Sequence, residues 1–163
     1  MCSSDLRPVE LTARAGSDLA VELIANQGVS APLRLRPGSA GSPALQAGGT
    51  LALLSEGTLD LSLQSALAAD QPLLRANRLE LSLGAGDLGS SAAPLRIDSG
   101  NDPSRGAGLA LRLASGASPS SAALRELQGS LTLVSPSRFS GSQAIALDGR
   151  SEEHTSELQS PCN

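Results

Sequence analysis

The residue types best suited to chemistry gather at the carboxyl end of the chain, in RSEEHTSELQSPCN (150–163). This segment holds the only histidine, His154, with Glu152, Glu153 and Glu157 beside it and Cys162 a few residues later. Carboxylates, imidazoles and thiolates bind zinc, and a glutamate beside a histidine can transfer protons. The spacing suits neither task, because the His-Glu-x-x-His pattern needs a second histidine and adjacent glutamates point in different directions. The pattern favours a polar chain end over a metal or catalytic site.

Both ends of the chain resemble translated DNA of a common sequencing-library adapter. RSEEHTSELQS (150–160) matches the translation of one adapter strand, and MCSSDL (1–6) matches the translation of its reverse complement with GTG as initiator. The two ends therefore correspond to the same DNA read on opposite strands. We expect residues 1–6 and 150–163 to be non-native, the latter irregular, and residues 7–149 to be a fragment of a larger protein.

The composition of residues 7–149 excludes several classes of function. They contain no cysteine, histidine, lysine, tyrosine, tryptophan or methionine, and Phe139 is their only aromatic residue. Without the two ends, the acidic residues fall from 16 to 12 and the basic residues from 12 to 11, so the net charge changes from −4 to −1. The segment lacks the usual base of a serine nucleophile, a disulfide framework and the charge and aromatic platforms of nucleic-acid binding. No apolar run is long enough to span a membrane.

Strict alternation of apolar and polar residues is the main structural signal in this segment. In TLDLSLQ and RLELSLG, leucines face one way while Asp60, Ser62, Glu80 and Ser82 face the other, as in a strand with one buried face. Gly, Ser, Asn, Asp and Pro separate such stretches and predict turns. SAALRELQG (121–129) could form a short helix or a turn-rich excursion. The predicted strands lie at 18–25, 32–37, 50–54, 58–64, 78–84, 94–98, 109–115, 130–135 and 144–149.

A repeated sequence unit predicts how these strands are arranged. SAPLRL (30–35) recurs as AAPLRI (92–97), and DQPLLR (70–75) lies between them, which fits a unit of about 20–22 residues. Such a unit buries its apolar face only by stacking on its neighbours. We therefore predict an all-β fold, a parallel β-helix (solenoid) of about six to seven rungs. An antiparallel β-sandwich is the alternative.

LELSLGAGDLGSSAAPLRID (79–98) resembles repeats of filamentous-haemagglutinin-like and other giant repetitive surface proteins of Gram-negative bacteria. The resemblance lies in a strand, a glycine-bounded turn at 86–89, a small and polar run, and a following strand that contains Pro94, Leu95 and Ile97. GVSAPLRL (28–35) is a weaker copy. The resemblance implies a right-handed β-helical passenger or stalk that is secreted or displayed at the outer-membrane or cell surface.

Two glycine- and aspartate-rich stretches could in principle bind ligands. GAGDLG (84–89) fits a dinucleotide-binding pattern, which requires a helix directly after the glycines. Pro94 and the alternation after it predict a strand there instead. With Asp87 it also resembles one defective calcium-binding nonapeptide, which works only in tandem copies. DSGNDPSRG (98–106) offers Asp98, Asn101 and Asp102 but lacks the calcium-loop pattern. We interpret the first stretch as a solenoid corner and the second as a polar turn.

A pair of carboxylates is the remaining candidate for catalysis. Asp60 and Glu80 face outward 20 residues apart and could stack on adjacent rungs, where paired acids can cleave sugar linkages. Outward charges are also the ordinary means of solvating a sheet. Arg34, Arg75 and Arg96 recur near the Pro-Leu unit and could form an outward ladder with the acids.

The sequence predicts no catalytic residue, no cofactor and no metal site. We expect a non-catalytic structural or adhesive segment of a large repetitive protein, in contact with neighbouring rungs and with host, neighbouring-cell or matrix surfaces, and with no nucleic acid or membrane insertion. The alternatives are a fragment of a β-helical polysaccharide-acting enzyme and a spurious translation with no native function.

Overall fold

The computed structural model describes seven stretches of the chain. Several sequence predictions fall on residues outside these stretches, including residues 1–6 and 150–163 with His154, Cys2 and Cys162. Those predictions concern residues outside the described part. The described residues are 8–24, 32–84, 87–100, 106–113, 122–128, 131–134 and 145–148.

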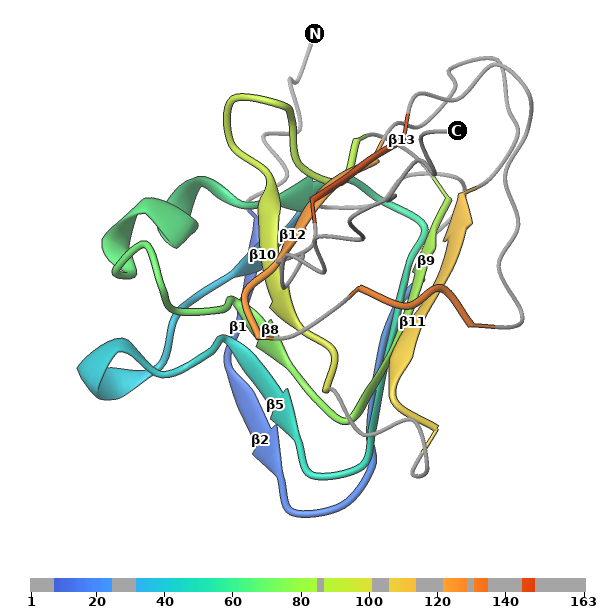
Figure 1. The fold of residues 1–163 in the computed structure, drawn as a ribbon. Helices are drawn as coiled ribbons and strands as arrows, with labels where there is room; N and C mark the ends of the chain where they lie inside the picture. Colours follow the sequence, from blue (N-terminus) through green and yellow to red (C-terminus); the bar gives the residue numbers. More distant parts are fainter. Residues whose placement is uncertain are drawn as a thin grey trace, which may run out of the picture.

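The chain forms a parallel β-solenoid with three sheets around a leucine-filled interior (Figure 1). Every strand pairing among the described residues is parallel, which confirms the predicted fold class and excludes the antiparallel sandwich. The first sheet has the order β1 (Val9–Leu11), β4 (Leu33–Leu35), β7 (Leu59–Asp60). The second has the order β13 (Ile145–Asp148), β12 (Ala122–Glu126), β10 (Leu95–Asp98), β8 (Leu74–Arg75), β5 (Leu45–Ala47), β2 (Ala13–Ala15). The third has the order β11 (Gly108–Leu113), β9 (Arg78–Leu83), β6 (Thr50–Ser55), β3 (Leu19–Leu23).

Each complete coil contributes one strand to every sheet. β1–β3, β4–β6 and β7–β9 form three such coils, and β10 to β13 extend the stack. The repeat is longer than the 20–22 residues that the sequence indicates. Partners in neighbouring coils lie 23 residues apart at Arg75 and Asp98 and 32 residues apart at Asp18 and Thr50. The three-sided coil therefore gives about three complete turns where the shorter unit predicts about six or seven rungs.

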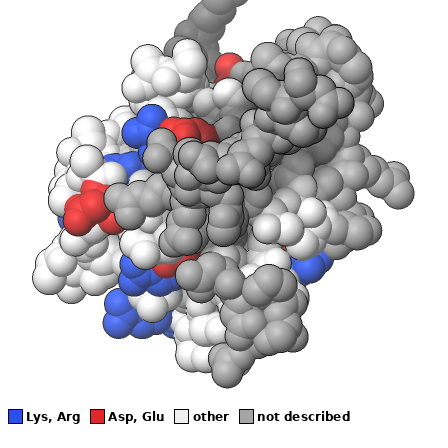
Figure 2. All heavy atoms as spheres, viewed as in Figure 1, with Lys and Arg blue, Asp and Glu red and all other residues white. Residues whose placement is uncertain are grey.

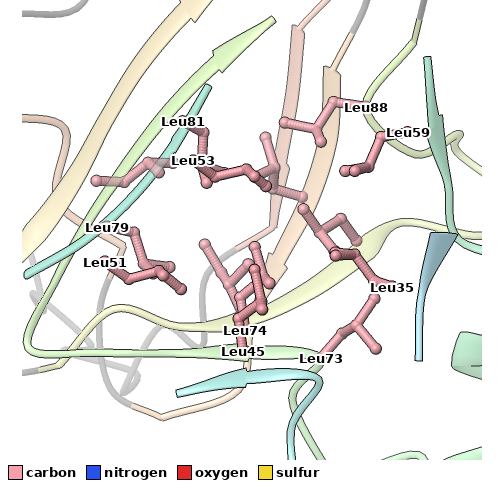
Figure 3. Packing of buried hydrophobic residues seen from close by; sticks show 14 of the residues in the cluster. Leu35, Leu45, Leu51, Leu53, Leu59, Leu73, Leu74, Leu79, Leu81 and Leu88 are labelled. Atoms are coloured by element: carbon pink, nitrogen blue, oxygen red, sulfur yellow. The ribbon is translucent and has the colours of Figure 1, made fainter. Parts of the chain in front are cut away.

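In-register stacks of leucine fill the interior. β6 and β9 bury every second residue, so Leu51 stacks on Leu79 and Leu53 on Leu81, each with at most 1% of its surface exposed. Figure 3 shows these leucines of the third sheet facing leucines of the other two sheets, such as Leu35 of β4 and Leu45 of β5. Leucine alone would favour a helix, but alternation aligns one apolar face per strand, and burial of that face outweighs the weak propensity.

Two local predictions, at 58–64 and at 121–129, are wrong. Only Leu59–Asp60 of the strand predicted at 58–64 is extended, because the chain then turns into the 3-10 helix η2 (Ser62–Ala66). Residues of the possible helix at 121–129 instead form β12, which pairs in register with β10. A second 3-10 turn, η1 (Ser39–Gly41), lies in the preceding coil.

Glycine occupies corners where the backbone is left-handed. Gly89, with φ +76°, closes the described part of the turn predicted at 84–89 and confirms its interpretation as a solenoid corner. At Gly100, with φ +72°, an added Cβ would lie 2.8 Å from the carbonyl oxygen of Asn77 in the coil below. Glycine at these corners therefore allows both the turn and close stacking.

Candidate functional site: a polar cleft at one corner of the solenoid

The coils differ most at the corner between the first and second sheets. In the first coil only Thr12 separates β1 from β2. In the next two coils, longer segments connect the corresponding strands, namely 36–44 between β4 and β5 and 61–73 between β7 and β8. These two excursions carry η1 and η2 and protrude on the same side of the molecule (left in Figure 1). The corner is therefore where the sequence varies the surface without disturbing the ladders.

The side chain of Gln64 ties the longer excursion to the sheet. Its Nε2 donates to the carbonyl oxygen of Pro94 at 2.8 Å, and its Oε1 accepts from the backbone N–H of Arg96 at 2.9 Å. Gln64 is 7% exposed, so both bonds lie away from solvent. The amide supplies the same donor and acceptor as a peptide group in a neighbouring strand, and so satisfies backbone groups of β10 beside η2.

Arg96 completes this clamp from the opposite direction. Its guanidinium donates to the carbonyl oxygens of Gln64, in the middle of η2, and of Ala68, just after η2. Burial lowers the pKa of Arg96, and the neighbouring positive charge of Arg125 lowers it further, while Asp70 acts in the opposite sense. An arginine whose donors are bonded to backbone carbonyls serves structure here.

A cleft of about 610 Å³ opens beside the clamp, between the η2 excursion and the turn that leads to β10. Arg125, its other arginine, pairs with Asp148 at 2.7 Å and has half of its side chain exposed. The serine hydroxyls and the half-exposed guanidinium of Arg125 can hydrogen-bond to a polar ligand, but the lining offers no activated nucleophile. The lining residues are Leu59, Leu61, Ser62, Gln64, Ser65, Ala69, Asp87, Gly89, Ser90, Ala92, Ala93, Pro94, Arg96 and Arg125.

A buried carboxylate that sequence reasoning missed lies next to this region. Glu126 is 1% exposed and occupies an inward position, in register with Ile97 of the coil below. Its Oε2 accepts from the backbone N–H and the hydroxyl of Ser99 at 3.0 and 2.6 Å, and its Oε1 accepts from the N–H of Gln128 at 3.1 Å. Burial raises the pKa of Glu126, and these hydrogen bonds oppose the shift only in part. Its alternation with Leu124 is the signal that could have revealed it.

Asp60 and Glu80 do not form the predicted pair on adjacent rungs. They lie in one coil but on different sheets, in β7 and β9, because 20 residues span only part of a three-sided turn. Asp60 Oδ2 accepts from Arg34 at 2.7 Å, and Glu80 Oε1 accepts from Arg78 at 2.8 Å. Hydrogen bonds from Ser62 lower the pKa of Asp60. A general acid needs a raised pKa to keep its proton, so Asp60 is not suited to that role. This geometry provides no general acid–base couple.

The three recurring arginines do not share one outward ladder. Arg34 stacks between Glu10 and Asp60 on the first sheet, at 3.5 and 2.7 Å, whereas Arg75 pairs with Asp98 on the second sheet at 2.9 Å. Arg96 is buried in the clamp. The predicted pairing with acids is therefore confirmed for two of the three. Figure 2 shows basic and acidic side chains lying next to one another on the visible face, without a large patch of one sign.

The described residues of the stretches considered for nucleotide or calcium binding have structural roles. Strand β10 follows the 84–89 turn in place of the helix that a dinucleotide site requires, and Leu88 is fully buried. The carboxylate of Asp98 accepts a hydrogen bond from Arg75. Asn101 and Asp102 lie outside the described residues. Across the described stretches, no three His, Cys, Asp or Glu side chains are grouped so that they could hold a metal ion.

No protein-family model matches the chain, and neither a curated protein nor a solved structure matches it. Among the described residues, the helices are too short and too polar to cross a membrane.

Proposed function

We propose that residues 7–149 are a non-catalytic structural or adhesive segment, a rod or passenger, of a large repetitive protein that is secreted or displayed at a Gram-negative cell surface. The observation that carries this proposal is that the strands repeat from coil to coil while the length of one corner changes. In-register leucine stacks and parallel ladders make the stiff part, while one corner changes in length from coil to coil. Its partners would be neighbouring coils and a host, neighbouring-cell or matrix surface.

The chemistry of the described side chains suits binding to another surface better than it suits enzymatic catalysis. The best candidate acid, Asp60, is held by Arg34 and Ser62, and Glu126 is buried among hydrogen-bond donors. The corner cleft presents serine hydroxyls, small apolar groups and the half-exposed Arg125, which suit weak and repeated polar contacts. Multiplied along a long solenoid, such contacts gain strength by avidity.

Beads coated with the full chain should bind layers of host cells or extracellular-matrix glycoprotein more strongly than uncoated beads. Ala92→Trp would partly fill the corner cleft from an exposed position, and we expect it to reduce binding several-fold. Ala146→Trp is the matched control, because Ala146 is exposed on β13 and does not line the cleft. Circular dichroism should show the same β-type spectrum for all three proteins.

Binding no greater than that of uncoated beads would refute the adhesive part of the proposal. Cleavage of any polysaccharide by the purified chain, abolished in Asp60→Ala, would refute the non-catalytic part and establish the β-helical enzyme instead. A helical or unfolded spectrum would point to a spurious reading frame.

A further inference from the structure

The polar corner cleft contains two arginines that lie side by side on neighbouring coils. Arg96 of β10 and Arg125 of β12 are register partners, and both side chains line the cleft. Adjacent strands lie about 4.8 Å apart, so two like charges stand next to each other, which destabilises a sheet. The positive charge of Arg125 accordingly lowers the pKa of Arg96. A negative charge in the cleft would offset this repulsion.

The described side chains balance the charge of Arg96 only in part. Arg96 is 8% exposed, and its guanidinium donates to backbone carbonyls without forming an ion pair among the described residues. A buried charge is unfavourable when it has no opposite charge beside it. Asp70 acts on Arg96 less strongly than Arg125 does, so the balance of these two neighbours is positive. The site therefore favours an additional anionic group.

Arg125 has hydrogen-bond donors available for such a group. Its Nε donates to Asp148 Oδ2 at 2.7 Å, whereas its Nη1 and Nη2 have no partner among the described residues. Half of the side chain is exposed, so a ligand can reach these donors. Two parallel N–H groups of a guanidinium match the two oxygens of a carboxylate, which makes a carboxylate the best-fitting anion.

The rest of the lining favours a peptide as the source of this carboxylate. Ser62, Ser65 and Ser90 are exposed and carry hydroxyls that can bond to peptide groups, and alanines and a proline add small apolar surface. Tyrosine and tryptophan, whose rings commonly pack against sugars, are absent from the chain. Asp87 also lines the cleft, so a ligand with one negative charge fits better than a polyanion.

We propose that the corner cleft binds a peptide segment of a partner protein through one acidic side chain, whose carboxylate pairs with Arg125 and offsets the charge of Arg96. The cleft volume of about 610 Å³ lies within the range of ligand sites. The proposal rests on the adhesive function and names the chemistry of its partner. Peptide binding in solution tests it separately from adhesion to cells, because either can fail without the other.

A pair of peptides that differ in one charge provides the test. The probe is a blocked pentapeptide with a central glutamate between alanines, and its counterpart has glutamine at the centre. Titration into the ¹⁵N-labelled full chain, followed by nuclear magnetic resonance, should give saturable shifts with the glutamate peptide. The glutamine peptide should bind at least about tenfold more weakly, because it lacks the hydrogen bonds between charged groups.

Variants at the arginine should shift this affinity in opposite directions. Arg125→Gln should weaken binding of the glutamate peptide about tenfold. Asp148→Asn removes the carboxylate that competes for Arg125 and should strengthen binding. Arg75→Gln is the matched control, because Arg75 also pairs through Nε with an aspartate of the next coil but does not line the cleft. All variants should keep the β-type circular dichroism of the unmodified chain.

Four results would overturn the proposal. They are equal binding of the two peptides, equal losses in Arg125→Gln and Arg75→Gln, weaker binding in Asp148→Asn, and tighter binding of glucuronic acid than of the glutamate peptide. The last result would assign the cleft to an acidic sugar and not to a peptide.

Discussion

At the scale of single residues, Glu126 makes the stability of the solenoid depend on pH. Its pKa is raised in the folded chain, so the folded chain keeps the proton to a higher pH than the unfolded chain does. The free energy of unfolding should therefore fall as the pH rises from about 4.5 through the raised pKa. We expect Glu126→Gln to remove about one proton from this dependence in urea-unfolding curves measured between these limits.

Glu80→Gln is the matched control, because Glu80 sits on the outer face with 42% of its side chain exposed. Its pH dependence should follow that of the unmodified chain. An unchanged pH dependence in Glu126→Gln would show that the buried carboxylate does not control this transition.

Gln64 should matter to stability more than its polar side chain suggests. Gln64→Ala leaves the carbonyl oxygen of Pro94 and the N–H of Arg96 without their partners in a buried place. Unfolding by urea should show a loss of about 1–3 kcal/mol. Gln46→Ala is the control, because the buried Oε1 of Gln46 has no hydrogen-bond partner among the described residues and its loss should cost less. Equal losses would mean that the Gln64 bonds add nothing beyond side-chain volume.

At the scale of elements, the position of a strand in the stack determines how much each of its leucines contributes to the free energy of unfolding. Leu81 in β9 lies between Leu53 and Leu111 of the adjoining coils, and Leu81→Ala should cost about 2–5 kcal/mol in unfolding free energy. Leu23→Ala in the half-buried first coil should cost about half as much. Comparable losses at the two sites would show that the first coil is buried as fully as the third in solution.

The elements also show what a sequence can predict. Long alternating stretches predict β3, β6, β9 and β11 correctly, because alternation over five or six residues leaves little ambiguity. The two- and three-residue strands cannot be recognised alone, since their extension depends on the coils on either side. β12 is the sharpest case, because Ala, Leu, Arg and Glu favour a helix locally and pairing with β10 decides otherwise.

At the scale of the whole molecule, the parallel solenoid follows from the sequence but its three-sided section does not. The period of the repeat is obscured by corner excursions of different length, such as the one that carries η2. The position of Asp60 relative to Glu80 depends on that section, which is why their predicted stacking fails. The Gln64–Arg96 clamp was equally invisible, because it joins residues 32 positions apart through an excursion that has no repeat pattern.

The direction of the hydrogen bonds between coils has a consequence for how the molecule yields under tension. These bonds join strands of successive coils, so they run along the solenoid axis and not along the chain. A pull applied at the two chain ends would unzip the terminal coil bond by bond while the remaining coils stay stacked. With 23 to 32 residues in each coil, every such event would release roughly 80–110 Å of extended chain. The molecule would then lengthen in discrete steps, each step recording the size of one coil and its excursions.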